Sequence, residues 1–208
     1  MTSDPKLPMA DAITAMQQAY IYLHDFHIRL SDTVMEIIEI IGKQSDLDLH
    51  FSKAETVSTD HPSFRQNPFD RNNRWVWDWF PLYAVRSFFE AKGPLNTGTL
   101  IIEVLFDADS KWEGKDDTSP SLADCDPKHS SLDVYFLFHP EKNQDWRKSW
   151  DETDYPDDAE TVSKCENGFK CIQFDIDLVT LINRDLIANR AREITMKALK
   201  QLNIEKIE

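Results

Sequence analysis

Four side chains of the kinds that bind zinc stand in the second half of the sequence: Cys125, His129, Cys165 and Cys171. Tetrahedral zinc needs four such ligands, but structural zinc sites usually place paired cysteines two to four residues apart. Five residues separate Cys165 from Cys171, and they include Asn167-Gly168, a strong signal for a two-residue hairpin turn. In that hairpin Cys165 lies opposite Lys170. Cys171 then lies opposite Lys164, so the two thiols point to opposite faces. The spacing favours ordinary thiols over a zinc site, and reduced thiols are the expected state.

A second candidate is a group of carboxylates with one histidine on the more polar faces of three expected strands: Glu103, Asp107, Asp133, His139 and Asp175. If those faces coincide, the cluster could bind a metal ion or transfer protons. The sequence does not fix the strand register, and a hydrated sheet face explains the same residues. We favour the hydrated face.

Asp78, Glu90 and Lys92 form a loose D…ExK pattern. It is similar to the site of metal-dependent nucleases of the restriction-enzyme type, in which two carboxylates hold Mg²⁺ and the lysine polarises the phosphate or the attacking water. The similarity covers one short stretch of the chain. In those nucleases this strand continues into a helix, whereas here another strand is expected. A magnesium-dependent nuclease is therefore the alternative function, and a solvated strand end is the plainer interpretation.

Two arginines and three tryptophans lie close together in the sequence from 71 to 79, near Asp78, and two more tryptophans follow later. These residues are Arg71, Arg74, Trp75, Trp77, Trp79, Trp146 and Trp150. Arginine beside aromatic rings is typical of protein-binding hot spots and also of platforms that stack nucleobases. These seven are our candidate binding residues. The alternative is that the aromatic rings belong to the core and that the arginines pair with surplus acids.

The charge of the chain is strongly negative and unevenly spread. The formal net charge is −14, and residues 107–160 hold 16 acids against 6 bases, a difference of −10. Residues 61–92 hold 5 bases against 3 acids, a difference of +2. A negative charge of this size repels nucleic acid and anionic lipid and attracts basic proteins. We expect a basic protein partner, although solubility alone would also explain the charge.

Several function classes lack their signatures in this sequence. It contains no P-loop, GxGxxG, GxSxG or HExxH motif, and only five glycines, which disfavours nucleotide-dependent enzymes. No cofactor is expected. The first residues form no secretory signal peptide, and no apolar run approaches the ~20 residues that span a bilayer. These features lead us to expect a cytoplasmic protein.

The clearest structural signal is an apolar seam, a set of nine residues spaced alternately three and four apart: Ile13, Met16, Tyr20, Leu23, His27, Leu30, Val34, Ile37 and Ile41. This heptad spacing predicts a helix over residues 9–41, about 50 Å long. Gly42 follows as an expected left-handed cap. The helix is longer than one sheet of this size needs. Part of the seam from Ile13 to Ile41 is therefore a candidate homodimer contact. His27 within it is expected to be a buried core histidine.

The rest of the pattern predicts strands and a final helix. Alternating apolar residues predict strands at 99–107 and 132–139, and a strand is also favoured over a helix for 81–92. A hairpin of 161–166 with 169–175 follows, with a short strand also considered at Leu47 to Phe51. Asp177 is expected to cap a helix that runs to Leu202. Residues 108–131 and 140–160 are expected to be acidic, mobile loops.

Together these signals predict a single α+β domain over residues 1–208. It has a long N-terminal helix, an antiparallel sheet of about four strands and a C-terminal helix, with both helices on one sheet face. The expected function is a non-catalytic interaction module of the inhibitor, immunity or accessory-subunit type, which presents an acidic surface to a basic partner.

Overall fold

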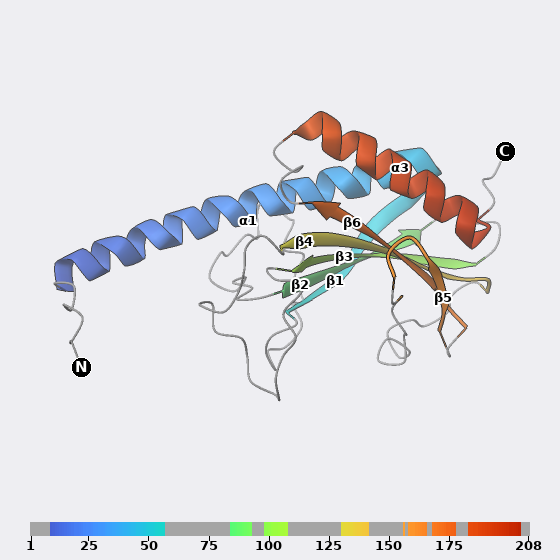
Figure 1. Ribbon diagram of the computed structural model, residues 1–208, viewed down its shortest axis with the longest axis horizontal. Helices are drawn as coiled ribbons and strands as arrows, with labels where there is room; N and C mark the ends of the chain where they lie inside the picture. The colour runs from blue at the N-terminus through green and yellow to red at the C-terminus, as the bar shows by residue number, and fades with distance from the viewer. Residues whose placement is uncertain are drawn as a thin grey trace.

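A six-stranded antiparallel sheet forms the body of the protein, and two helices cover one of its faces (Figure 1). The computed structural model describes residues 9–56, 84–92, 98–107, 130–141, 156, 158–165, 168–177 and 183–204. The predicted α+β architecture is confirmed, with six strands in place of about four. The two edge strands correspond to segments named from the sequence, the short strand considered at Leu47 to Phe51 and the hairpin segment 161–166.

The elements follow one another in the order α1 (Met9–Ser45), β1 (Asp48–Thr56), β2 (Ala84–Lys92), β3 (Thr99–Asp107), β4 (Ser131–His139), β5 (Val162–Lys164), β6 (Lys170–Asp177) and α3 (Arg184–Leu202). In the sheet their order is β1-β2-β3-β4-β6-β5. Residues 84–92 are therefore strand, as the sequence favoured. The short strand considered at Leu47 to Phe51 is the first part of the longer edge strand β1.

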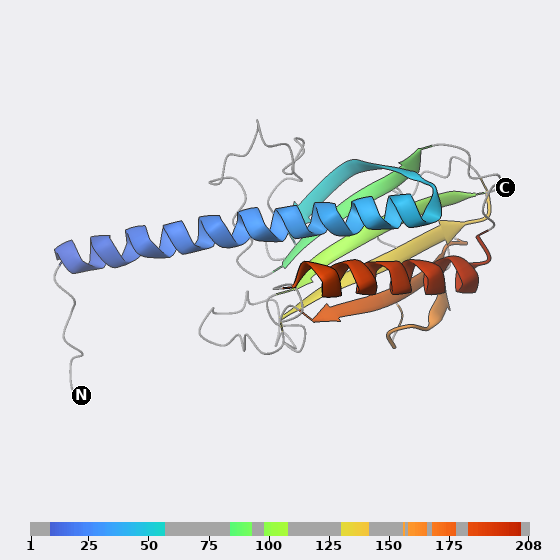
Figure 2. The same ribbon diagram turned by 90° about the horizontal axis from the view of Figure 1, so that it is seen from above.

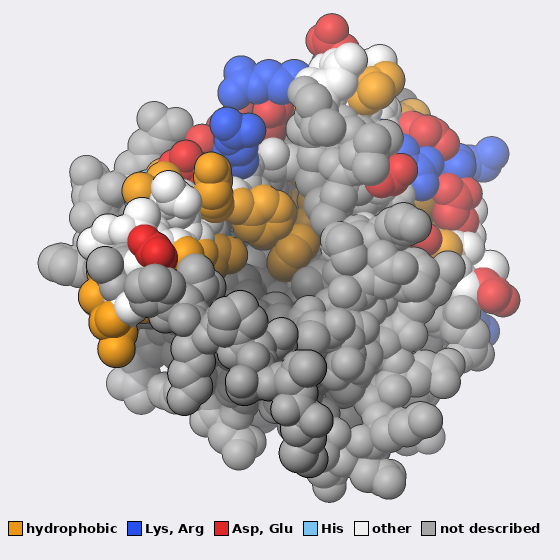
Figure 3. Space-filling model, turned by 60° about the vertical axis from the view of Figure 1, so that its left-hand side comes forward, with side chains coloured by type: hydrophobic (Ala, Val, Ile, Leu, Met, Phe, Trp, Pro, Cys, Tyr) orange, Lys and Arg blue, Asp and Glu red, His pale blue; other side chains and the backbone are white. Residues whose placement is uncertain are grey.

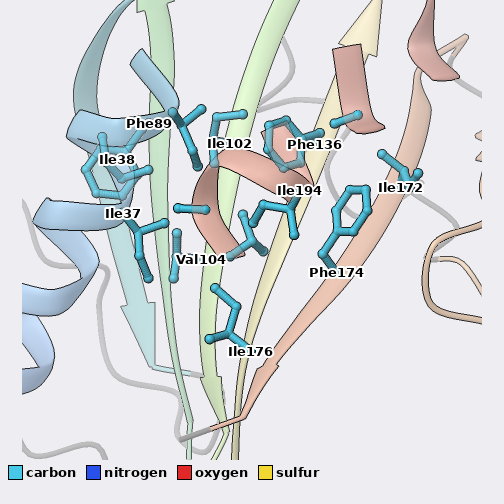
Figure 4. Close-up of a cluster of buried hydrophobic side chains, with 14 of the residues drawn as sticks. Ile37, Ile38, Phe89, Ile102, Val104, Phe136, Ile172, Phe174, Ile176 and Ile194 are labelled. Atoms are coloured by element: carbon cyan, nitrogen blue, oxygen red, sulfur yellow. The ribbon is translucent and has the colours of Figure 1, made fainter. Parts of the chain in front are cut away.

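The helix-covered face of the sheet holds the main core. Because side chains alternate along a strand, every second residue of β3, β4 and β6 points to the helices. Phe136 and Phe174 meet edge to face there, with ring centroids 5.8 Å apart. Ile194 of α3 lies beside these two rings, and Ile37 of α1 lies in the same cluster on the side of Phe89 and Val104 (Figure 4). Burying each of these side chains contributes about 1.5–3 kcal/mol to folding.

Helix α1 ends four residues beyond the predicted boundary, at Ser45, and Gly42 lies inside it. The left-handed residue is Asp46, with φ of 60°. The Leu47 backbone N–H donates to the Gly42 carbonyl at 2.9 Å, which is the long-range bond of a Schellman cap. A Cβ at residue 42 would lie 2.8 Å from the Leu47 carbonyl oxygen. The glycine is thus needed for close approach and not for a left-handed backbone.

Helix α3 begins later than predicted, and its cap is Asn183. The Asn183 side-chain oxygen accepts hydrogen bonds from the backbone N–H groups of Asp185 at 3.0 Å and Leu186 at 3.4 Å. Asp177, the predicted cap, is the last residue of β6. Asparagine and aspartate cap helices equally well, so the residue type alone could not choose between these two positions.

Candidate functional site

All seven predicted binding residues lie outside the described part of the chain: Arg71, Arg74, Trp75, Trp77, Trp79, Trp146 and Trp150. The same holds for Cys125 and His129 of the zinc hypothesis, and the expected loops 108–131 and 140–160 fall largely outside it as well. The interaction role assigned to these segments stays a prediction.

Of the D…ExK residues, only the Glu90 side chain is described. Its carboxylate accepts a hydrogen bond at 2.7 Å from the hydroxyl of Ser52. Ser52 is the extra residue of a bulge in β1, between the positions that pair with Phe89 and Phe88. Asp78 lies outside the described residues, and Lys92 is described only as a backbone position in β2. The nuclease hypothesis therefore stays a prediction.

The polar face of the sheet is buried along its inner strands, so the expected hydrated face is wrong there, whereas Asp175 of β6 is exposed. Glu103 and Asp133 are both buried. The guanidinium of Arg86 lies 3.6 Å from the Glu103 carboxylate. Phe88 and Ile101 belong to a second apolar cluster on this face. A buried carboxylate is tolerated when a cation lies beside it, which explains how acids could occupy a covered face.

The register brings only part of the predicted carboxylate cluster together. Glu103 pairs directly with Tyr135, and Asp133 pairs with Asp175. Burial raises the pKa of the Tyr135 hydroxyl above its ordinary value, and the charges of Asp133 and Glu103 raise it further. His139 lies at the far end of β4, opposite Thr99. The side chain of Asp107 is not described. No group of three His, Cys, Asp or Glu side chains that could hold a metal ion occurs among the described residues.

The two described cysteines share one face, in contrast to the prediction. The Cys165 N–H donates to the Phe169 carbonyl at 2.8 Å. The hairpin loop between Cys165 and Phe169 therefore holds three residues. Its last residue, Gly168, has φ of 85°, as three-residue hairpin loops require. The extra loop residue shifts the register by one, and Cys171 now pairs with Ser163.

Both thiols lie in the second apolar cluster and are buried. Burial raises the pKa of the Cys171 thiol above its ordinary value, and nearby Cys165 and Glu103 raise it further. A buried thiol with a raised pKa is a poor nucleophile and a poor metal ligand. The predicted divergence of the two thiols was therefore wrong, and the expectation of ordinary thiols stays a prediction because Cys125 and His129 lie outside the described residues.

Acidic side chains of the 107–160 segment are partly engaged within the molecule. Glu160 forms ion pairs with Lys197 at 2.8 Å and Arg190 at 3.3 Å, and Glu193 also contacts both cations. These contacts lower the pKa of Glu160, with the Lys197 hydrogen bond as the largest cause. Of the described acids in this segment, Asp133 is thus buried and Glu160 forms ion pairs with α3.

The feature with the strongest implication for function is the first half of α1, here called the arm and defined as residues 9–26. It projects from the body as a single helix (Figures 1 and 2). None of its described side chains is buried. Eight large hydrophobic side chains of the arm are exposed: Met9, Ile13, Met16, Tyr20, Ile21, Tyr22, Leu23 and Phe26. Hydrophobic side chains reach the surface where the arm comes forward (Figure 3).

The arm meets the body at Phe26 and His27. The Phe26 ring packs on Phe106 of β3, with centroids 5.6 Å apart, and lies edge-on to the His27 ring at 5.7 Å. Among the described side chains of α1, His27 is the first that is buried. Burial, and then the neighbouring charge of His24, lower the pKa of His27 to about 4. His27 is therefore neutral at pH 7 and belongs to the core, as expected.

Sequence reasoning found the seam but missed which part of it faces the solvent. The seam from Leu30 to Ile41 is buried against the body, whereas Ile13, Met16 and Leu23 are 46%, 51% and 41% exposed. The available signal was length, because a helix of 37 residues extends about 55 Å. Ile21 and Tyr22, which lie off the seam, were not singled out as surface residues.

Comparison with known proteins yields one match. A protein-family model described as PM0109 matches residues 7–203. Neither the curated proteins nor the solved structures contain a match. In the described part of the chain, no helix is both long and apolar enough to cross a membrane.

Proposed function

The chain belongs to the PM0109 family, and because that name states no activity, we propose a function from the geometry: a non-catalytic protein-interaction module of the inhibitor, immunity or accessory-subunit kind. The observation that carries this proposal is the arm. A helix that leaves its own core and keeps eight large hydrophobic side chains exposed is stabilised when another molecule covers it.

The composition of the arm supports a contact surface over a catalytic one. Between Asp11 and His24, residues 12–23 carry no ionisable group except the two phenols of Tyr20 and Tyr22. Helix-in-groove and helix-pair contacts use side chains of this kind at spacings of three and four residues. The side chains are suited to burial and include no carboxylate, imidazole, amine or thiol.

We assign a second surface to the acidic segment 107–160, which holds 16 acids against 6 bases and of whose acids Asp133 is buried and Glu160 is paired with α3. This surface would be selected by a basic protein, because complementary charge raises association rate and specificity. A DNA or RNA partner does not fit a chain of net charge −14. The arm and the acidic segment thus suit two different kinds of contact, one apolar and one electrostatic.

The test is capture of partners by the tagged full chain from a lysate of the cells that make it, at low and at high salt. We expect a basic protein in stoichiometric amount at roughly 0.05 M salt and its release at roughly 0.5 M, because screening weakens exposed charge pairs. A charge-reduced bait, in which four of the acids at 113–126 are changed to the matching amides, should recover much less. Recovery of no stoichiometric basic protein, or of one whose binding ignores salt and the amide changes, would contradict the proposal.

A further inference from the structure

We propose that the arm pairs with the arm of a second copy of this chain to form a twofold homodimer. This inference rests on the proposed function, since it names the occupant of a surface that was assigned to protein contacts. A second copy is favoured by three observations: the continuity of the seam, the absence of charged residues from 12 to 23 and the length of the exposed helix.

The exposed seam continues the one that packs on the body. Along α1 the buried residues Leu30, Val34 and Ile37 are spaced four and three apart, as the exposed residues Met16, Tyr20 and Leu23 are in the arm. That spacing places one apolar stripe along the whole helix. The apolar stripe that packs against α3 and the sheet in the second half of α1 thus continues into the arm, where it is exposed.

The opposite side of the arm is polar. Asp11, Thr14, Gln18 and Asp25 recur at spacings of three, four and seven residues, half a turn away from the seam. Because this polar stripe lies opposite the seam, we expect a contact centred on the seam, as in a helix pair. Ile21 and Tyr22 lie to the two sides of this polar stripe.

Charge argues for a copy over the other occupants. Residues 12–23 contain no Asp, Glu, Lys, Arg or His. A basic partner would find no counter-charge there, and anionic lipid or nucleic acid would find no Lys or Arg. Two copies of net charge −14 repel each other in general, yet they meet no like charge along this stripe. An uncharged, self-complementary stripe is what an isologous contact requires.

The size of the exposed helix sets the expected strength. Residues 9–26 extend about 27 Å at 1.5 Å per residue. A helix pair of that length buries an area at the low end of stable interfaces, so we expect a micromolar, reversible dimer. Each chain has a mass of 24.2 kDa, and the dimer therefore has twice that mass.

The experiment measures the mass of the full chain by light scattering across the micromolar range. We expect the weight-average mass to rise from 24.2 kDa towards double that value as concentration increases. Leu23→Glu places a carboxylate in the paired stripe and should raise the dimer Kd at least ~100-fold. Met16→Glu should act in the same way. Gln18→Glu adds the same charge on the polar side and should leave the Kd within a few-fold.

Salt separates this contact from the electrostatic one. Because the stripe is uncharged while the chains repel, roughly 0.5 M salt should leave the dimer unchanged or tighten it, whereas the complex with a basic protein should dissociate. A mass of 24.2 kDa at every concentration and salt would overturn the dimer. A dimer that Leu23→Glu and Met16→Glu leave intact would overturn its assignment to the arm. Either result leaves the salt-sensitive capture of a basic protein to decide the proposed function separately.

Discussion

The two halves of α1 carry the same seam and meet opposite environments. From His27 to Ile41 the seam is buried against the sheet and α3, and Ile37 and Ile41 have no exposed surface. In the arm, Met16 is 51% exposed and Leu23 is 41% exposed. Seam spacing alone therefore predicts that one face of the helix is buried. How much of that face is buried within the chain depends on how far the sheet and α3 extend along the helix. The part beyond the body is available to another molecule.

The largest expected difference is in the free energy of unfolding. Ile37→Ala removes side-chain volume from a closed core and should cost about 2–5 kcal/mol. Ile13→Ala, the same change at a seam position of the arm, should cost under about 0.5 kcal/mol when the chain is monomeric. Urea unfolding of both variants at low protein concentration measures the two losses in free energy of unfolding. Equal losses would show that the arm packs on the body and would contradict the contrast between the two halves of α1.

The junction between the halves should respond to pH through His27. Its pKa is lowered from 6.5 to about 4 in the folded protein, so between these values the unfolded chain binds more protons. Stability from this group is present above pH 6.5 and is lost as the pH falls towards 4. The loss is on the order of 3 kcal/mol.

The variant His27→Leu should lack this component of the pH dependence. His24→Gln, one turn earlier and part-exposed, should keep most of it. Thermal unfolding of the three proteins from pH 7 to pH 4 measures the difference. Identical slopes for the wild type and His27→Leu would show that His27 is not buried in its neutral form.

A smaller effect is expected when the helix of the arm is weakened, because the stability of the body should not depend on it. Ala15→Gly, at an exposed position away from the seam, lowers helix propensity by about 1 kcal/mol. We expect a reduced helical signal in circular dichroism and an unchanged unfolding midpoint for monomeric protein, because the arm makes few contacts with the core. A lowered midpoint would mean that the arm and the body unfold as one unit.

The sequence predicted best where a pattern repeated within one element. Alternation from Thr99 to Asp107 located β3 at its observed bounds, and heptad spacing located α1. Single-residue signals did worse. Gly42 was expected to end the helix, yet it allows close approach of the Leu47 carbonyl. Asn167-Gly168 indicated the hairpin correctly and its loop length wrongly, and one residue of loop reversed the relation between Cys165 and Cys171.

The burial of the second sheet face could not be predicted from its residue types. Glu103 and Asp133 resemble solvent-facing residues, and only the register places Arg86 near Glu103. Cross-strand neighbours depend on loop lengths and pairing, which local sequence does not encode. The exposed arm could not be located for a similar reason, because the size of the body is a property of the whole sheet.

Hydrogen exchange at several protein concentrations measures whether another molecule covers the arm. We expect backbone amides of residues 12–23 to exchange fast in dilute protein and more slowly as concentration rises through the micromolar range, while amides of residues 30–41 stay protected throughout. Leu23→Glu should remove the concentration dependence, and Gln18→Glu should keep it. Fast exchange of residues 12–23 at every concentration, with and without a captured partner, would contradict the account.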